Sequence, residues 1–200
     1  NINTSCGNFS SKVCCGSFGK RSNLDIKWKR PFAIQKASKL NNFIGVKYHI
    51  QTDFPVDSIA LHNFEDGYCG VSRIEDNRYC LCYLTNAANL KKNHNSISEM
   101  EKNVLYRNPH LRTIFTTCKH LYDQPLSISQ ISFHAKSQVE NHVLLVGDAS
   151  GVITPLCGNG MSMAMHASKL AFEQINAFLK GQITREAMEQ HYTRTWRREF

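Results

Sequence analysis

The chain has 200 residues, which corresponds to roughly a domain and a half at about 150 residues per domain. Hydrophobic residues make up 42% of it and there are only 11 Gly and 5 Pro, so the composition excludes collagen-like, low-complexity and wholly disordered chains. The net charge is +8, but residues 12–39 hold eight basic residues and one acid, a net of +7. Because the charge is confined to one segment, this segment either faces a phosphate or is a solvated edge; we favour the solvated edge and expect no nucleic-acid partner.

Eight cysteines are present, but no pair has the C-x-x-C spacing of a zinc or redox motif, and the histidines are scattered singly. We therefore predict no metal site. No signal peptide is recognisable, which favours a cytoplasmic location, and no apolar run is long enough to span a bilayer, so any membrane contact is expected to be peripheral. The chain begins at Asn1 and ends inside a predicted helix, so we expect both ends to be cut.

The first expected element is a strand over residues 12–16, followed by a glycine turn over residues 16–22. Gly19 and Lys20 suggest a phosphate-binding loop. That motif needs a glycine five residues before Gly19, however, and Cys14 stands there. We therefore exclude a phosphate-binding loop of this kind.

An antiparallel meander is predicted for the middle of the chain, where apolar and polar residues alternate in segments separated by turn residues. The segments cover residues 43–50, 58–64, 68–74 and 79–84. Short connections imply that neighbouring segments pair, and such a sheet normally buries one face. Tyrosines of these segments are candidates for the wall of an apolar pocket: Tyr48, Tyr68, Tyr79 and Tyr83.

Helices are predicted next, over residues 96–107 with a serine cap and over residues 109–115 beginning at a proline. Residues 119–130 show no clear period and are expected to be irregular. A further strand is expected over residues 131–135.

The most informative stretch begins with a continuous apolar run over residues 143–147, which is typical of a strand buried on both faces. Asp148 follows at the carboxyl end of this strand, where open α/β sheets bind ligands, and an ionised carboxylate accepts hydrogen bonds from a sugar or ribityl hydroxyl. A Gly-Asn-Gly sequence at residues 158–160 opens a predicted helix that reaches residue 179. Its glycines leave backbone N–H groups unobstructed and directed at an anion or an electron-rich ring.

Two other interpretations of this stretch are weaker. Residues 160–164 mimic the nucleophile elbow of serine hydrolases, but that motif requires a strand immediately before the serine, and a proline-containing loop intervenes here. The Gly-x-Gly at residues 158–160 lacks the third glycine of a dinucleotide fingerprint and does not directly follow the strand.

Residues 147–165 as a whole resemble the second flavin-binding motif of FAD-dependent monooxygenases and reductases of the p-hydroxybenzoate hydroxylase fold. This family includes geranylgeranyl reductases and flavin-dependent halogenases. The Gly-Asp pair, the proline and the Gly-x-Gly that enters an alanine-rich helix all stand at the family's spacing. Residues 13–22 resemble, less closely, the family's strand and Asp-Gly motif, with Ser-Phe-Gly in place of the acid, and Tyr192 and Trp196 also match.

The resemblance implies FAD as the cofactor and NAD(P)H as the electron donor. Asp148 would hold the ribityl or nearby hydroxyls of FAD, and Pro155 would lie beside the reactive edge of the isoalloxazine. The N–H groups near Gly160 and Met161 would face its N1–C2=O locus, where reduction places negative charge. The cofactor-binding residues that the motif implies are Gly147, Asp148, Gly151, Pro155, Gly158, Asn159, Gly160 and Met161.

The fold that the resemblance implies is α+β with an α/β part. Residues 1–30 and 136–200 would form part of an FAD-binding domain, and residues 31–135 an antiparallel-sheet substrate domain. Family members begin with a βαβ unit that carries GxGxxG, and residues 1–30 do not supply one. We therefore expect the chain to be the carboxyl-terminal part of a catalytic unit that lacks its amino-terminal nucleotide-binding half, and to bind FAD weakly by itself.

The expected reaction is monooxygenation, or another oxidation, of an apolar or aromatic small molecule. Residues 67–72 occupy the place of a strand that faces the substrate in this family, so Tyr68 and Cys69 are the candidates for lining the substrate pocket. The Trp and Phe-Pro of the reductases are missing there, and no lysine signature of a halogenase is evident. No side-chain base is assigned, because the cofactor performs the difficult step. The alternatives are an isoprenoid-type reductase and a truncated, non-catalytic flavoprotein-like binding module.

Overall fold

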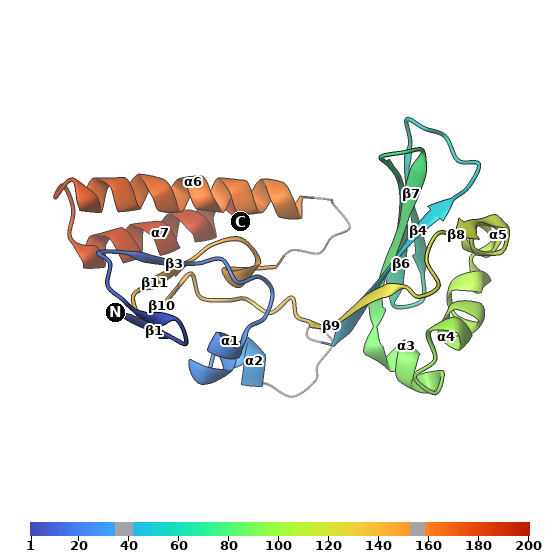
Figure 1. The fold of residues 1–200 in the computed structure, drawn as a ribbon, viewed down its shortest axis with the longest axis horizontal. Helices are drawn as coiled ribbons and strands as arrows, with labels where there is room; N and C mark the ends of the chain where they lie inside the picture. Colours follow the sequence, from blue (N-terminus) through green and yellow to red (C-terminus); the bar gives the residue numbers. More distant parts are fainter. Residues whose placement is uncertain (35–41, 153–158) are drawn as a thin grey trace. The chain divides into compact units, whose positions relative to one another are not determined.

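The structure, a computed structural model, describes residues 1–34, 42–152 and 159–200. The chain divides into two compact units, Asn1–Lys36 with Phe133–Phe200 and Ala37–Ser132 (Figure 1). The resemblance predicts divisions after residues 30 and 135. The structure instead places the short helix α2 (Pro31–Ile34) in the first unit rather than in the sheet domain. The first unit is therefore assembled from two segments that are distant in the sequence.

The second unit is built on an antiparallel sheet that contains the predicted meander. Its strand order is β5-β6-β7-β4-β8, and β9 also pairs with β4. The α+β class predicted from the sequence is confirmed. The strands are β4 (Phe43–Gln51), β5 (Ile59–Phe64), β6 (Gly67–Ile74), β7 (Arg78–Asn86), β8 (Lys119–His120) and β9 (Leu126–Ile131).

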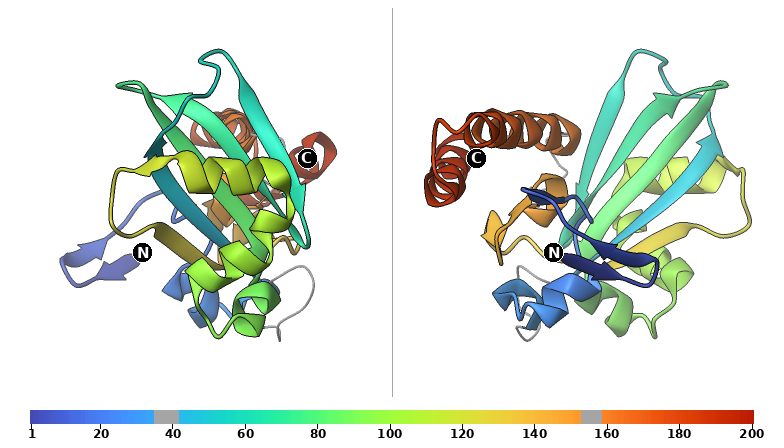
Figure 2. Two further views of the ribbon diagram at one scale, coloured as in Figure 1. Left: turned by 90° about the vertical axis from the view of Figure 1, so that its right-hand side faces the viewer. Right: turned by 60° about the vertical axis from the view of Figure 1, so that its left-hand side comes forward.

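Helices cover one face of this sheet, as Figures 1 and 2 show: α3 (Ala87–Lys92), α4 (Ile97–Asn103) and α5 (Pro109–Thr117). The predicted helix over residues 96–107 is interrupted at Val104, after which a 3-10 turn, η1 (Leu105–Arg107), follows. Alternate residues of the strands point toward the helices because the side-chain period of a strand is two. The core that results includes the fully buried side chains Ile50, Val71, Leu81, Met100 and Leu111.

Residues 119–130 are not irregular, which corrects the prediction. They contain β8 and most of β9, and β9 ends at Ile131, where the sequence suggests that a strand begins. The side chains of Leu126 and Ile128 are 70% and 52% exposed, so backbone pairing with β4 rather than burial holds this strand. A strand with exposed side chains on both faces shows little alternation of apolar and polar residues. The hydrophobic pattern therefore does not predict β9.

The first unit joins its two segments in a small sheet. β3 (Cys14–Gly16) pairs in parallel with β11 (Val143–Leu145), which pairs antiparallel with β10 (Val139–Glu140). The predicted strand over residues 143–147 ends two residues early, and a 3-10 turn, η2 (Gly147–Ala149), follows it. A hairpin of β1 (Ile2–Thr4) and β2 (Gly7–Phe9) and the short helix α1 (Asn23–Lys27) precede α2.

Two long helices complete the first unit, α6 (Gly160–Leu179) and α7 (Arg185–Glu199). The bounds of α6 confirm the helix predicted from residue 160 to residue 179. Its inner side packs with α7 and β11 around a core of Leu144, Leu170, Ala171, Met188 and Tyr192. The Tyr192 hydroxyl donates a hydrogen bond to the Leu145 carbonyl at 2.6 Å, which joins α7 to the end of β11.

Candidate functional site

A pocket of about 490 Å³ lies in the first unit where three chain segments meet. Parallel pairing sets Gly16 of β3 opposite Leu145 of β11, so the loops that follow these strands leave the sheet at the same edge. These loops and the amino-terminal half of α6 supply the lining, which consists of Ser17, Gly19, Val146, Gly147, Asp148, Gly160, Met161, Ala164 and Ser168. The pocket therefore combines a glycine turn, a strand end and a helix amino terminus.

The structure brings four of the predicted cofactor-binding residues to this pocket: Gly147, Asp148, Gly160 and Met161. Asp148 is exposed, so its carboxylate is accessible to a ligand. The backbone of Gly147 has φ +60°, a left-handed conformation that glycine adopts without the strain imposed on a residue with a Cβ. This turn allows the chain to leave β11 and present residue 148 at the pocket.

The remaining predicted residues lie elsewhere or outside the described residues. Gly151 is buried and does not line the pocket; a Cβ there would lie 2.7 Å from two ring carbons of Trp196, so the close approach of α7 requires glycine at this position. Asn159 is the residue before α6, and its side chain makes no capping hydrogen bond. Pro155 and Gly158 fall among the residues that the structure does not describe.

The amino terminus of α6 contributes a partial positive charge to the pocket. The helix has 20 residues, and its aligned peptide dipoles place a partial positive charge at its first turn. A side-chain cap would neutralise part of this charge, and Asn159 does not provide one. Gly160 has no Cβ to shield the backbone, and apart from its chain neighbours and the backbone of its own helix no atom of the described residues lies within 4 Å of where a Cβ would stand.

Buried side chains fix the loop that carries the carboxylate. Three successive carbonyl oxygens of this loop, at positions 148, 149 and 150, accept hydrogen bonds from outside it. The donors are Lys136 Nζ at 2.7 Å, Arg30 Nη1 at 3.0 Å and Gln138 Nε2 at 3.2 Å, respectively. The backbone of the loop is thus held from within the unit, and the carboxylate at position 148 remains on the pocket side.

Lys136 joins the two loops that border the pocket. Its side chain is 6% exposed, and its ammonium donates to the carbonyl of Lys20 at 2.8 Å as well as to that of Asp148. The ammonium also lies 4.4 Å from the ring centroid of Phe32. Burial is the main cause that lowers the pKa of Lys136 to about 8, and the neighbouring guanidinium of Arg30 adds to the effect.

Arg30 is the second buried cation of this unit. It is 1% exposed and pairs with Asp25, which is fully buried, at 2.7 Å. Its other amino group donates to the Ser137 carbonyl at 2.9 Å. The basic segment that the sequence analysis treats as a solvated edge therefore contains a structural cation. Sequence reasoning missed Arg30 and Lys136, because neither lies at a motif position and a basic residue is ordinarily exposed.

The two predicted substrate residues face opposite sides of the large sheet. Cys69 is fully buried in the core between the sheet and its helices, and desolvation strongly raises the pKa of its thiol. Tyr68 is half-buried and, as its neighbour on β6, points to the other face. Cys69 therefore packs in the core, and the two side chains do not line one pocket.

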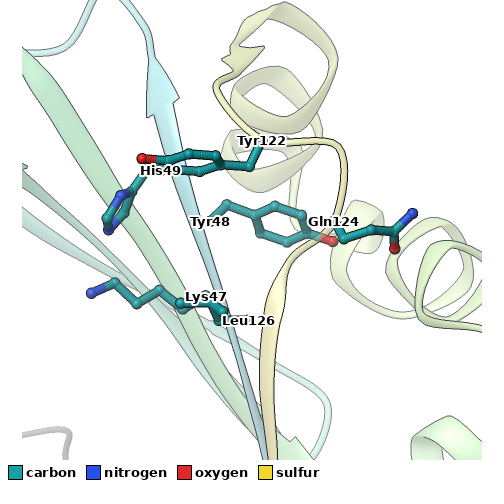
Figure 3. A pocket seen from close by; sticks show the side chains of 6 residues that line it. All are labelled: Lys47, Tyr48, His49, Tyr122, Gln124 and Leu126. Atoms are coloured by element: carbon teal, nitrogen blue, oxygen red, sulfur yellow. The ribbon is translucent and has the colours of Figure 1, made fainter.

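A second pocket, of about 330 Å³, lies at the edge of the large sheet beside β4. Tyr48, one of the tyrosines proposed from the sequence as a pocket wall, lines it, whereas Tyr79 and Tyr83 are buried in the core. The other lining residues come from β4, from the segment that leads to β9 and from the first residue of β9 (Figure 3): Lys47, His49, Tyr122, Gln124 and Leu126. No sequence motif marks this pocket, because the pairing of β4 with two different strands creates it.

In the parts of the chain that the structure describes, no three or more His, Cys, Asp or Glu side chains are placed to hold a metal ion. Within the same residues, no helix is both long and apolar enough to cross a bilayer.

Comparison with solved structures places this fold among those of flavin-dependent enzymes. The halogenase CmlS matches with a TM-score of 0.68 and 16% identity over 93% of this chain and 34% of its own. The flavin-dependent brominase Bmp2 matches with a TM-score of 0.70 and 18% identity over 91% of this chain and 46% of its own. A geranylgeranyl bacteriochlorophyll reductase-like protein from Thermoplasma acidophilum matches with a TM-score of 0.68 and 15% identity over 95% and 47%.

These similarities confirm the fold that the sequence resemblance implies. Among curated proteins, conditioned medium factor receptor 1 of Dictyostelium discoideum is 26% identical over 156 residues, which cover 74% of this chain and 29% of that protein. The chain spans less than half the length of each of these relatives. No family model matches the sequence.

Proposed function

We propose that this chain is part of an FAD-dependent oxidoreductase and that the first-unit pocket holds the flavin. The observation that carries the proposal is the convergence, in one pocket, of the exposed Asp148 carboxylate and the amino terminus of the 20-residue helix α6. A flavin presents ribityl hydroxyls, which donate to a carboxylate, and a ring edge that gains negative charge on reduction. The residues present therefore fit this group, and the shared fold supports the same assignment.

Bound FAD would supply the redox chemistry, with NAD(P)H as the electron donor. Asp148 accepts hydrogen bonds from hydroxyl groups and thereby orients the cofactor. The backbone N–H groups at the start of α6 direct a fixed positive potential into the pocket, and a preorganised dipole stabilises developing negative charge without reorganising. Lys136 and Arg30 hold the loop beneath Asp148, so the carboxylate keeps its position.

The proposed substrate is an apolar or aromatic small molecule, and the proposed reaction is its monooxygenation. Support comes from the face of the large sheet that the helices leave uncovered. Apolar side chains on this face are strongly exposed, with Ile59 at 77% and Leu61 at 50% on β5, and Leu126 and Ile128 on β9. Exposed apolar surface of this extent is typical of a site that binds another molecule.

The test is the visible absorption spectrum and FAD affinity of the protein purified from its full coding sequence. Asp148→Ala is expected to weaken FAD binding by about tenfold to a hundredfold, the effect of losing one or two hydrogen bonds to a charged acceptor. Asp53→Ala removes an exposed carboxylate from the second unit and is the matched control. Absence of flavin bands with added FAD, or equal affinities for the two variants, would refute the assignment.

A further inference from the structure

A pair of stacked histidines joins the edge strand of the large sheet to one of the helices that cover it. β5 is the outermost strand in the order β5-β6-β7-β4-β8 and pairs with β6. His62 of β5 is the register partner of Cys69, so it points to the helix-covered face. His110, in the first turn of α5, lies against it, with ring centroids 5.6 Å apart and ring planes 24° apart. The two rings therefore form part of the contact between β5 and α5.

Two further interactions join β5 and the turn after it to the residues before α5. The Asn108 side chain donates to the Asn63 carbonyl at 3.0 Å, and Arg107 pairs with Glu65 at 2.7 Å. Both side chains of the ion pair are exposed, at 69% and 55%, and an exposed ion pair contributes little to stability. The charge of the histidine pair therefore affects how firmly β5 is held against α5.

His62 is placed where a positive charge is unfavourable. Its Nε2 atom is buried and has no hydrogen-bond partner among the described residues. Protonation puts an N–H on both ring nitrogens, so the buried Nε2 gains a charge and a donor that no acceptor meets. Burial, and then the charge of His110, lower the pKa of His62. The His62 ring is therefore neutral in the folded protein at neutral pH.

The titratable groups around the pair do not offset a positive charge on it. Cys69 stays a neutral thiol, because burial strongly raises its pKa. Arg112 of α5 is exposed and two positions after His110, and residues two apart on a helix do not face each other. Arg107 and Glu65 neutralise one another. Protonation of both histidines therefore places two positive charges on stacked rings beside the positive end of α5.

We propose that His62 and His110 form an acid-sensitive contact, which holds β5 against α5 at neutral pH and separates when both rings are protonated. Separation removes the ring stacking at the start of α5 and exposes the covered side of the edge strand. The other side of β5 carries the exposed Ile59 and Leu61, so the contact acts on the strand that borders the uncovered apolar face. The contact requires no flavin, so its test is independent of the proposed function.

The first measurement is a pH titration of the full protein, labelled in its histidine rings, followed by NMR. The two ring resonances are assigned by their loss in His62→Gln and in His110→Gln. We expect the His62 midpoint to lie below 6.5, the value of an unperturbed histidine, and to rise toward it in His110→Gln. A His62 midpoint at or above 6.5, or one that His110→Gln leaves unchanged, would overturn the proposal.

The second measurement is urea unfolding at pH 7.5 and at pH 5. The unfolded state takes up a proton on His62 near pH 6.5 and the folded state only at lower pH, so acidification favours unfolding. Each unit by which the His62 midpoint lies below 6.5 corresponds to about a tenfold decrease in the folding equilibrium constant. Equal pH dependence in the unmodified protein and in folded His62→Gln would contradict the proposal.

His94→Asn is the matched control for these variants. His94 is an exposed histidine of the same unit with φ +55°, a left-handed conformation that asparagine also adopts. This variant loses one histidine without touching β5 or α5, so we expect it to keep the pH dependence of the unmodified protein.

Amide hydrogen exchange measures the separation itself. After correction for intrinsic exchange rates, we expect the protection of β5 amides at pH 5 to fall relative to that of β7 amides, because β7 lies inside the sheet. In His62→Gln this selective loss should be smaller. Protection that changes equally in β5 and β7 would show that no local separation occurs and would overturn the proposal.

Discussion

Replacing Lys136 with Met tests the view that one buried ammonium joins the two loops that border the proposed flavin pocket. Methionine has a similar length and no charge, so the substitution removes the hydrogen bonds to the carbonyls of Lys20 and Asp148, at 2.8 and 2.7 Å, without creating a large cavity. Both carbonyls then lose a buried donor. We expect the protein to be destabilised and the pocket to lose its fixed geometry.

The expected magnitude follows from opposing contributions. Hydrogen bonds from a charged donor stabilise by about 1.5–3 kcal/mol each, and the contact with the Phe32 ring adds about 0.5–1 kcal/mol. Burial of the ammonium opposes them, because lowering the pKa of Lys136 from 10.5 to about 8 corresponds to roughly 3 kcal/mol. The net loss in the free energy of unfolding at neutral pH is therefore about 2 kcal/mol.

The pH dependence of this loss distinguishes it from a simple packing defect. Between pH 8 and 10.5 the unfolded state holds a proton on Lys136 that the folded state has released, so this lysine makes the native protein more stable as the pH rises. Lys136→Met lacks that gain, and the destabilisation should therefore increase from pH 8 to pH 9.5. Urea unfolding at pH 8 and at pH 9.5 measures this loss in the free energy of unfolding. The control is Lys12→Met, because Lys12 is an exposed lysine of the same unit.

A destabilisation that stays constant or shrinks over this pH range would refute the reasoning, as would equal effects of the two variants. A pocket-specific effect should also appear in ligand binding. The full-length Lys136→Met protein is expected to bind FAD more weakly at temperatures where it is still fully folded, because the Asp148 loop is then held by fewer contacts.

Substitutions at two further positions, Glu101 and Gly151, test the packing on which the two units depend. Glu101 accepts hydrogen bonds from the Tyr48 and Tyr83 hydroxyls at 2.7 and 2.9 Å, and burial raises the pKa of its carboxyl group. Glu101→Gln keeps an acceptor without the buried charge, so it should change the free energy of unfolding by less than about 1 kcal/mol. Glu101→Leu leaves both hydroxyls unpaired and should lower the free energy of unfolding by about 2–4 kcal/mol. Urea titration measures both effects. Gly151→Ala places a Cβ 2.7 Å from the Trp196 ring and should lower the free energy of unfolding by about 1–3 kcal/mol. An unchanged thermal unfolding midpoint would show instead that α7 shifts to make room for the added Cβ.

Local patterns in the sequence located much of the proposed flavin site. The apolar run at residues 143–147, the Gly-Asp pair and the helix from residue 160 are properties of adjacent residues, and the structure brings Gly147, Asp148 and Gly160 to one pocket. The resemblance to a known motif predicted the same positions. The role of Gly151 differs, because its neighbour Trp196 lies 45 residues further along the chain and no local pattern reveals that contact.

The second unit shows what local patterns in the sequence do not predict. Alternation predicted the strands of the meander but did not say which face of β6 the helices would cover, and Cys69 lies on the covered face. β9 escaped prediction because its exposed side chains carry no burial signal, so only its pairing with β4 reveals it. The pocket beside β4 depends on that same pairing and was therefore invisible in the sequence.

The sequence by itself predicted the strands of the meander, the helix from residue 160 and the motif that carries Asp148, because turn chemistry and hydrophobic period act over a few neighbouring residues. Tertiary structure alone decided which residues meet across the chain. Lys136 contacts the carbonyl of Lys20, 116 positions away, and Arg30 contacts that of Ala149, 119 positions away. These cations are buried only because the parallel pairing of β3 with β11 brings the two segments together, and a long-range pairing of this kind leaves no periodic signal in the amino-acid sequence.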